Sequence, residues 1–239
     1  MNRICLLLLF LILLTMNQHI TAQNQTNQKV DIQKNTTLKY LLWLPADYNK
    51  DKTKTFPILI FLHGSGERGD NLEKVKTHGP PSYVDKQADF PFILVSPQCT
   101  EDTRWMWKVD ELQAMLEEIK NKYRIDSDRI YLTGLSMGGF GTWAWAISQP
   151  GQFAAIAPVC GGGLSHYAYE LKNTPVWAFH GDSDDVVDVK NSIEMVEAVN
   201  ATGGSARITI YPGVGHDSWV NAYNEAELYK WFLSQSKKK

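Results

Sequence analysis

The sequence predicts an α/β fold in which a mostly parallel, doubly wound sheet carries helices on both faces. Strand patterns alternate with helix patterns along the chain, as they do in parallel sheets. Residues 56–62 form an uninterrupted apolar run, which is typical of a strand buried on both faces of such a sheet. The apolar run 130–132 passes through a glycine-rich turn into the apolar segment 140–147, which indicates a strand, a sharp turn and a helix.

Length and composition fit one domain of this class. The chain has 239 residues, of which 44% are hydrophobic, and a chain of this length can bury a sizeable core. Its formal net charge of −2 gives no support for a nucleic acid partner. The three lysines at 237–239 are too few to change this and predict a solvated tail.

The N-terminus has the pattern of a signal peptide over residues 1–22. Arg3 precedes an apolar run at 4–14, and Ala22 offers a small residue at a cleavage point. The apolar run is shorter than the roughly 20 residues that a membrane span needs, so we expect no stable membrane insertion. The protein is therefore predicted to be secreted or periplasmic. Residues 23–29 are polar and predict a disordered leader, which leaves 30–239 as a single domain.

The cysteines predict buried free thiols and no metal site. Cys5 would leave with the signal peptide, whereas Cys99 and Cys160 would remain. Export would permit a disulfide, but each of these two follows a different predicted strand, and we expect those strands not to be neighbours. No Cys/His cluster has the spacing of metal ligands, so neither a metal nor a cofactor is expected.

The other elements follow from periodicity and turn residues. We expect strands at 30–32, 38–44, 56–62, 90–95, 130–132, 154–159, 175–179 and 207–211, the first two at an edge of the sheet. We expect helices at 110–123, 140–147, 192–199 and 226–233. The segment 72–87 contains two consecutive prolines that break any helix, and it is predicted to cover part of a cleft.

The turn between strand 130–132 and the next helix has the sequence G-x-S-x-G, centred on Ser136. In this context the pattern predicts a nucleophile elbow. Gly134 and Gly138 lack Cβ atoms, so the strand and the helix can approach closely on either side of the serine. The start of the helix offers free N–H groups where an oxyanion would form. The alternative is a glycine-rich turn with an ordinary serine.

Two further loops can meet Ser136 at the same edge of the sheet. One carries Asp182, Asp184 and Asp185, and the other carries His216; each follows a predicted strand. The carboxyl ends of parallel strands share one edge, so the three loops can converge. A serine hydroxyl is a poor nucleophile until a base takes its proton, and a histidine oriented by a carboxylate can do this. Spacing alone does not choose among the three aspartates.

The loops after two other strands are candidates for the same cleft. The glycine-rich stretch 63–69 follows a buried strand, so its backbone N–H groups can point into a cavity, although a plain flexible turn has the same composition. Trp105 and Trp107 follow the predicted strand 90–95 and could form a flat apolar wall of a pocket. Packing of either tryptophan on the core explains the pattern equally well.

Three segments together resemble the α/β-hydrolase superfamily: Gly134 to Gly139, His63 to Gly69 and His216 to Trp219. The similarity is to serine esterases near the predicted-peptidase, dienelactone-hydrolase, phospholipase/carboxylesterase and polyhydroxybutyrate-depolymerase-like groups. It covers roughly residues 38–233. The resemblance implies the α/β-hydrolase fold and a catalytic domain over 30–239.

The resemblance also implies roles for particular residues. The acid motif of the superfamily, H-G-x-x-D-x-x-V, selects Asp184 and completes a triad with Ser136 and His216. The oxyanion hole would consist of the backbone N–H groups of Ser65 and Met137. Structural roles are implied for the histidines of the two H-G motifs, at positions 63 and 180.

The predicted function is a secreted serine esterase that cleaves carboxylic esters through an acyl-enzyme on Ser136. Its partner would be a small-molecule or polysaccharide ester, of the acetyl or feruloyl type. One alternative is a serine peptidase of the prolyl-oligopeptidase type, although 239 residues leave no room for the large gating domain of those enzymes. Another is a non-catalytic binding protein, but no member of the triad is missing from the sequence.

Overall fold

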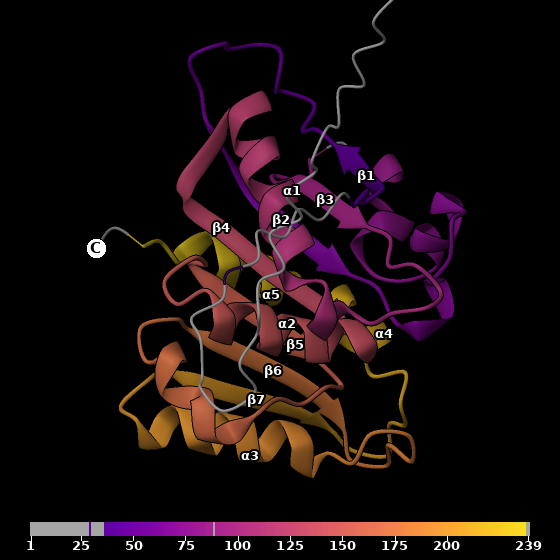
Figure 1. Ribbon diagram of the computed structural model, residues 1–239, viewed down its shortest axis with the longest axis vertical. Coiled ribbons are helices and arrows are strands. Elements are labelled where there is room, and N and C mark those ends of the chain that lie inside the picture. Colours follow the sequence, from indigo (N-terminus) through magenta and orange to yellow (C-terminus); the bar gives the residue numbers. More distant parts are fainter. Residues whose placement is uncertain (1–28, 30–35, 88, 238–239) are drawn as a thin grey trace, which may run out of the picture. The chain divides into compact units, whose positions relative to one another are not determined.

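The computed structural model describes residues 29, 36–87 and 89–237 of the chain (Figure 1). The chain divides into two units, Met1–Asn35 and Thr36–Lys239, and every element below belongs to the second. The predicted signal peptide, nearly all of the predicted leader and the predicted strand at 30–32 lie outside the described residues. Within the described part of the chain, no helix combines the length and the apolar character that crossing a bilayer requires.

The second unit is built on a seven-stranded sheet with the order β1-β3-β2-β4-β5-β6-β7 (Figure 1). The strands are β1 Tyr40–Trp43, β2 Phe56–Leu62, β3 Ile93–Pro97, β4 Ile125–Leu135, β5 Ala155–Val159, β6 Val176–Gly181 and β7 Ala206–Tyr211. β1 lies at the edge and pairs antiparallel with β3, and all other pairings are parallel. The predicted fold class and the predicted edge strand are confirmed.

Helices cover both faces of this sheet. The α-helices are α1 Val109–Lys122, α2 Met137–Ser148, α3 Lys190–Ala201, α4 Trp219–Asn224 and α5 Ala226–Ser234. Short 3-10 helices are η1 Ser65–Glu67, η2 Leu72–Thr77, η3 Pro80–Ser82, η4 Val84–Lys86, η5 Trp105–Trp107 and η6 Ser165–Leu171. One core cluster contains side chains of α1, α2 and α3, and the other contains side chains of α4 and α5. The two clusters therefore lie on opposite faces of the sheet.

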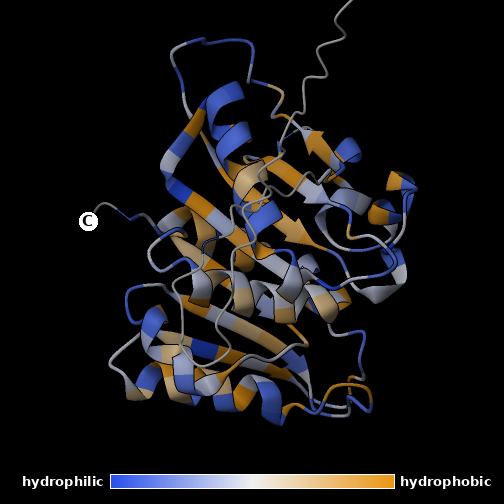
Figure 2. Cartoon of the chain, in the orientation of Figure 1, coloured by the Kyte–Doolittle hydropathy of each residue, from blue (hydrophilic) through white to orange (hydrophobic). Residues whose placement is uncertain are grey.

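The apolar run of β2 serves both cores. Ile58 and Ile60 point into the cluster with α1 to α3, whereas Leu59 and Phe61 point into the cluster with α4 and α5. This alternation follows from the two-residue period of a strand, and it explains why the run contains no polar residue. In Figure 2 the central strands are mainly orange, whereas α1 is largely blue.

Several elements differ from the sequence prediction, among them α4, which was not predicted. β3 begins at Ile93 rather than at residue 90, and Phe90 and Phe92 pack in the second core just before it. β4 begins at Ile125, earlier than predicted, because Phe56 of β2 pairs with that residue. The segment 72–87, in which the prolines were predicted to break any helix, forms the short 3-10 helices η2 to η4, and together with β1 and β3 it lines a small cavity of about 120 Å³.

The sheet and α2 approach each other closely at the turn that contains Ser136. A Cβ atom on Gly138 would lie 1.9 Å from the carbonyl oxygen of Leu62, and one on Gly134 would lie 2.5 Å from the carbonyl oxygen of Gly138. No L side chain fits at either distance. The two glycines therefore allow the first turn of α2 to rest directly on the backbone at the end of β2.

Gly138→Ala should lower the free energy of unfolding by about 1–3 kcal/mol, because the added methyl group forces α2 away from the end of β2. Gly66→Ala is the matched control, since a Cβ atom at that glycine meets no atom within 4 Å. Urea denaturation followed by circular dichroism measures both values. Equal stability of the two variants would contradict the close packing at Gly138.

Candidate active site

The backbone of Ser136 has the strained conformation of a nucleophile elbow. Its φ and ψ angles are 51° and −115°, a region that non-glycine residues seldom occupy. Its N–H donates to the carbonyl oxygen of Val159 at 3.0 Å, and its own carbonyl oxygen accepts from the N–H of Phe140 at 3.0 Å. These bonds join the turn to β5 and to α2, so the hydroxyl is held at the open edge of the sheet.

The structure brings the side chains of Ser136, His216 and Asp184 into one hydrogen-bonded chain. His216 Nε2 lies 2.9 Å from Ser136 Oγ, and His216 Nδ1 lies 2.8 Å from Asp184 Oδ2. The serine follows β4, the aspartate follows β6 and the histidine follows β7. Both distances suit proton transfer from the hydroxyl to an imidazole that a carboxylate orients.

Hydrogen-bond donors surround the carboxylate of Asp184, whose side chain is fully buried. Its Oδ1 accepts from the backbone N–H groups of Val186 and Val187, each at 2.9 Å. Burial raises the pKa of Asp184, but these donors and His216 oppose it and hold the pKa below its ordinary 3.8. The ionised carboxylate accepts the Nδ1 proton of His216, which leaves Nε2 free to accept the serine proton.

The two neighbouring aspartates have other surroundings. Asp182 Oδ1 accepts from the N–H of Gly213 at 2.7 Å and from the hydroxyl of Ser183 at 2.9 Å, so it joins the loops after β6 and β7. The side chain of Asp185 is exposed. Of the three aspartates that spacing left open, Asp184 is the one bonded to His216.

The buried His180 also contacts Asp184, although the resemblance implied only a structural role for it. Its Nε2 lies 3.1 Å from Asp184 Oδ2 and 2.9 Å from the carbonyl oxygen of Val187. Both partners accept hydrogen bonds, so Nε2 carries the proton and donates. The signal in the sequence was the H-G-x-x-D spacing, which places this histidine four residues before the acid.

A cleft of about 290 Å³ opens beside the serine. Its lining residues come from three loops and from the start of α2: Ser65, Arg104, Met106, Ser136, Met137 and Phe140. Both residues predicted to supply oxyanion donors therefore border the same cleft as the nucleophile. Met137 is the first residue of α2, where backbone N–H groups have no partner within the helix.

His63 orients the peptide group that contains the Ser65 N–H. Its Nε2 accepts from the N–H of Cys99 at 3.0 Å, and its Nδ1 donates to the carbonyl oxygen of Gly64 at 2.6 Å. Burial lowers the pKa of His63 to about 4, so the ring is neutral with its proton on Nδ1. The Gly64 carbonyl and the Ser65 N–H belong to one planar peptide group, so fixing the carbonyl fixes the direction of the N–H.

Cys99 and Cys160 are buried free thiols, as predicted. Burial raises the pKa of Cys99 to about 11 and that of Cys160 to about 12. Both groups are therefore protonated at neutral pH, and protonated thiols are weak nucleophiles.

The two tryptophans of η5 occupy different environments. Trp107 is 64% exposed. Trp105 is fully buried, and its Nε1 donates to the carbonyl oxygen of His63 at 2.9 Å. The prediction that Trp105 forms part of a pocket wall is wrong, because a side chain with no exposed surface cannot touch a substrate. It packs instead on α2, where a Cβ atom at Gly141 would lie 2.4 Å from Trp105 Cβ.

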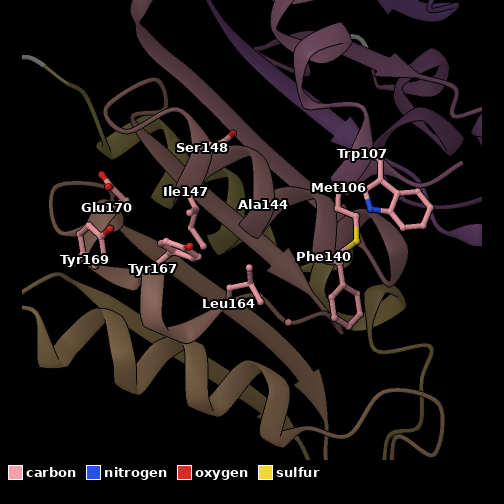
Figure 3. Close-up of a pocket in the computed structure, with 12 residues that line it drawn as sticks. Met106, Trp107, Phe140, Ala144, Ile147, Ser148, Leu164, Tyr167, Tyr169 and Glu170 are labelled. Carbon is pink, nitrogen blue, oxygen red and sulfur yellow. The ribbon is translucent and has the colours of Figure 1, made fainter. Parts of the chain in front are cut away.

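Trp107 lines a larger groove of about 610 Å³ (Figure 3). The lining residues come from η5, α2 and the connection between β5 and β6: Met106, Trp107, Phe140, Ala144, Ile147, Ser148, Gly162, Gly163, Leu164, Tyr167, Tyr169 and Glu170. Met106 and Phe140 line both the groove and the cleft at Ser136, so the two cavities adjoin. No sequence motif marks the residues between 162 and 170 as part of a site.

The family of this chain follows from a match to a family model. The model of the dienelactone hydrolase family matches residues 96–231, which include Ser136, Asp184 and His216. The chain belongs to the dienelactone hydrolase family. This confirms the resemblance to α/β-hydrolase esterases and makes the chain an esterase-family hydrolase.

Relatives of this chain include proteins named as acetylxylan and feruloyl esterases. A bifunctional acetylxylan esterase/xylanase of Neocallimastix patriciarum is 29% identical over 55% of this chain, but the chain covers only 20% of that protein. "Probable feruloyl esterase C" of Aspergillus niger is 24% identical over 76% of this chain and 68% of its own length. The crystal structure of a thermostable esterase has a TM-score of 0.73 and 32% identity over 83% of this chain and 59% of that one.

Asp184→Asn should lower kcat by about 10⁴-fold, the effect of the same exchange in serine proteases, because the amide no longer holds His216 in the required tautomer. Asp182→Asn should have a milder effect. Asp185→Asn is the control on the same loop, since its side chain is exposed. Steady-state hydrolysis of p-nitrophenyl acetate measures all three, and a larger loss at position 182 or 185 would move the assignment.

The pH dependence of kcat/KM should show a single ionisation on its acid side. His216 accepts the serine proton only when it is neutral, so the rate should rise with pH when it is measured across roughly pH 5–8. The pKa of Asp184 is lowered, so this carboxylate remains ionised through that range and adds no second step. A flat profile across it would argue against a histidine base.

Trp105→Ala and Trp107→Ala should separate stability from substrate preference. The first removes a buried side chain and should cost about 3–5 kcal/mol of folding free energy. The second removes an exposed side chain and should change stability by about 0.5 kcal/mol or less, while lowering kcat/KM for a feruloyl ester relative to an acetyl ester. Thermal denaturation and a pair of p-nitrophenyl esters measure these effects. An unchanged preference in Trp107→Ala would remove this residue from the site.

Proposed function

We propose that the protein is an exported serine hydrolase that cleaves carboxylic esters through an acyl-enzyme on Ser136. The observation that carries this proposal is the chain of hydrogen bonds from Ser136 through His216 to Asp184, at 2.9 and 2.8 Å. A strained serine at the start of a helix and a cleft above it complete the requirements for nucleophilic catalysis.

The reaction begins when Ser136 Oγ attacks the ester carbonyl carbon and His216 Nε2 takes the hydroxyl proton. The carbonyl oxygen becomes an oxyanion in the tetrahedral intermediate. When that intermediate collapses, the bond to the alcohol oxygen breaks, and His216 returns the proton to the leaving alcohol. Water, deprotonated by His216, then attacks the acyl-enzyme, and the acid leaves as Ser136 regains its proton.

The backbone N–H groups of Ser65 and Met137 receive the oxyanion in this mechanism. Both residues line the cleft at Ser136, and His63 holds the peptide group that carries the first donor. Loss of one such donor costs roughly 3 kcal/mol in other serine hydrolases. Asp184 stabilises the imidazolium that forms when His216 holds the proton.

The substrate class that we propose is an ester carried by a polysaccharide, with an acetyl or a feruloyl acyl group. The names of the Neocallimastix and Aspergillus relatives support this class. The signal-peptide pattern at residues 1–22 predicts export. Export would support this substrate class, because such polymers lie outside the cell.

Covalent labelling tests the proposed function directly. A fluorophosphonate should label the wild-type protein at Ser136, and Ser136→Ala should neither be labelled nor hydrolyse p-nitrophenyl acetate, although it should fold normally. Labelling elsewhere or retained turnover in Ser136→Ala would refute the proposal. Faster cleavage of peptide p-nitroanilides than of p-nitrophenyl esters would instead favour the peptidase alternative.

A further inference from the structure

The two adjoining cavities lie on one side of the nucleophile. Among the described residues that line them, none belongs to the loop 182–187, which carries Asp184, or to the loop 212–219, which carries His216. The cleft is bordered by Ser65, by Met137 and by the side chains that lead into the groove. Both cavities therefore extend from Ser136 toward α2 and η5.

This placement distinguishes the two halves of an ester. The leaving alcohol must receive a proton from His216 Nε2, so its oxygen lies beside that ring when the intermediate collapses. The oxyanion points to the donors of the cleft. The remaining substituent on the carbonyl carbon is the acyl group, and the adjoining cavities are the space available to it.

We infer that the groove along α2 is an extended binding site for long aromatic acyl groups. This inference rests on the proposed function and assigns the groove to the acyl half of the substrate rather than to the alcohol. A cavity of about 610 Å³ beyond the cleft is much larger than an acetyl group can use. Long acyl groups would pass Met106 and Phe140 and enter it.

The length of the groove follows from the helix that forms its floor. Phe140, Ala144, Ile147 and Ser148 line it from one side of α2, as their spacing of three and four residues requires. At 1.5 Å per residue, these positions extend over about 12 Å. An acyl group with several bonds between its carbonyl carbon and its far end is needed to contact Ala144 and Ile147.

The chemistry of the walls favours an aromatic acyl group. Trp107 and Tyr167 present exposed rings to the groove (Figure 3), and Met106 lines both the cleft and the groove. Rings and sulfur atoms make favourable contacts with another ring. Tyr169 and Glu170 lie at the end away from Trp107 and can bond a hydroxyl on the ring. None of the described residues that line the groove is a lysine or arginine, so the groove itself offers no counter-ion to an anionic acyl group; Arg104 lines the cleft.

Filling the groove tests the assignment. Ala144 is partly exposed and lines the groove, so Ala144→Trp should obstruct it without disturbing the core. Ala114→Trp makes the same exchange at an exposed position of α1 that lines neither cavity. The substrates are acetyl, octanoyl and cinnamoyl esters of p-nitrophenol, which share one alcohol, and phenyl and naphthyl acetates, which share one acyl group.

In Ala144→Trp the ratio of kcat/KM for the cinnamoyl ester to that for the acetyl ester should fall about tenfold or more. The ratio for the two acetates should stay at its wild-type value, and Ala114→Trp should keep both ratios. Tyr167→Ala, at a surface position, should raise KM for the cinnamoyl ester relative to the acetyl ester. Tyr167→Ala therefore tests the groove independently if Ala144→Trp does not fold.

Three results would overturn the inference: an unchanged cinnamoyl-to-acetyl ratio in the folded variants, a change in the naphthyl-to-phenyl ratio instead, or wild-type preference for the octanoyl over the cinnamoyl ester. The last would indicate an aliphatic acyl group. Fluorophosphonate labelling of Ser136 and hydrolysis of p-nitrophenyl acetate by the wild-type protein separate these failures from failure of the proposed function. If both are absent in the wild type, the proposed function itself has failed.

Discussion

The rest of the site depends on the close approach of α2 to the end of β2. β2 lies between β3 and β4, so its position is fixed on both sides. The first turn of α2 rests on the carbonyl oxygen of Leu62 because Gly138 has no side chain. The chain continues from Leu62 directly into His63, Gly64 and Ser65. One backbone contact thus fixes the distance between the nucleophile, which precedes α2, and the loop that holds a predicted oxyanion donor.

The charged part of the site depends on the buried carboxylate of Asp184, whose two oxygens both have hydrogen-bond donors. Removing Asp184 from water is costly unless its oxygens are hydrogen-bonded. Two backbone N–H groups bond one oxygen, while His216 and His180 contact the other. Three of these donors come from the turn after β6 and from its last residues, so the loop that carries the acid also stabilises its charge, whereas His216 follows β7. Because the carboxylate cannot rotate freely, it fixes the orientation of the His216 ring.

Physical patterns in the sequence predicted the sheet and the three loops that meet at Ser136, whereas the choice of Asp184 among three aspartates came from the resemblance. Strands buried on both faces are apolar throughout, and parallel strands bring their ends together, so β2 and the three loops were recognisable. The first half of β4 was not, because its residues 126–129 are polar. The groove was not predicted either, since it forms between α2 and η6, and no local pattern relates these segments. α2 and η6 come close together only in the folded sheet, where β5 pairs with β6, because η6 lies in the connection between these two strands.

The burial of Trp105 shows how the core and the wall of the groove are coupled. Trp-Met-Trp forms one turn of 3-10 helix, in which successive side chains point about 120° apart. Once Trp105 packs on Gly141 and bonds the His63 carbonyl, Met106 and Trp107 are directed outward to the groove. The same buried ring lies 5.0 Å from the His63 ring, which orients the Gly64 peptide. Trp105 is fully buried, yet it links α2, the loop 63–69 and the wall of the groove. The geometry of the cleft therefore depends on a residue of the core, whereas the exposed neighbours Met106 and Trp107 line the groove.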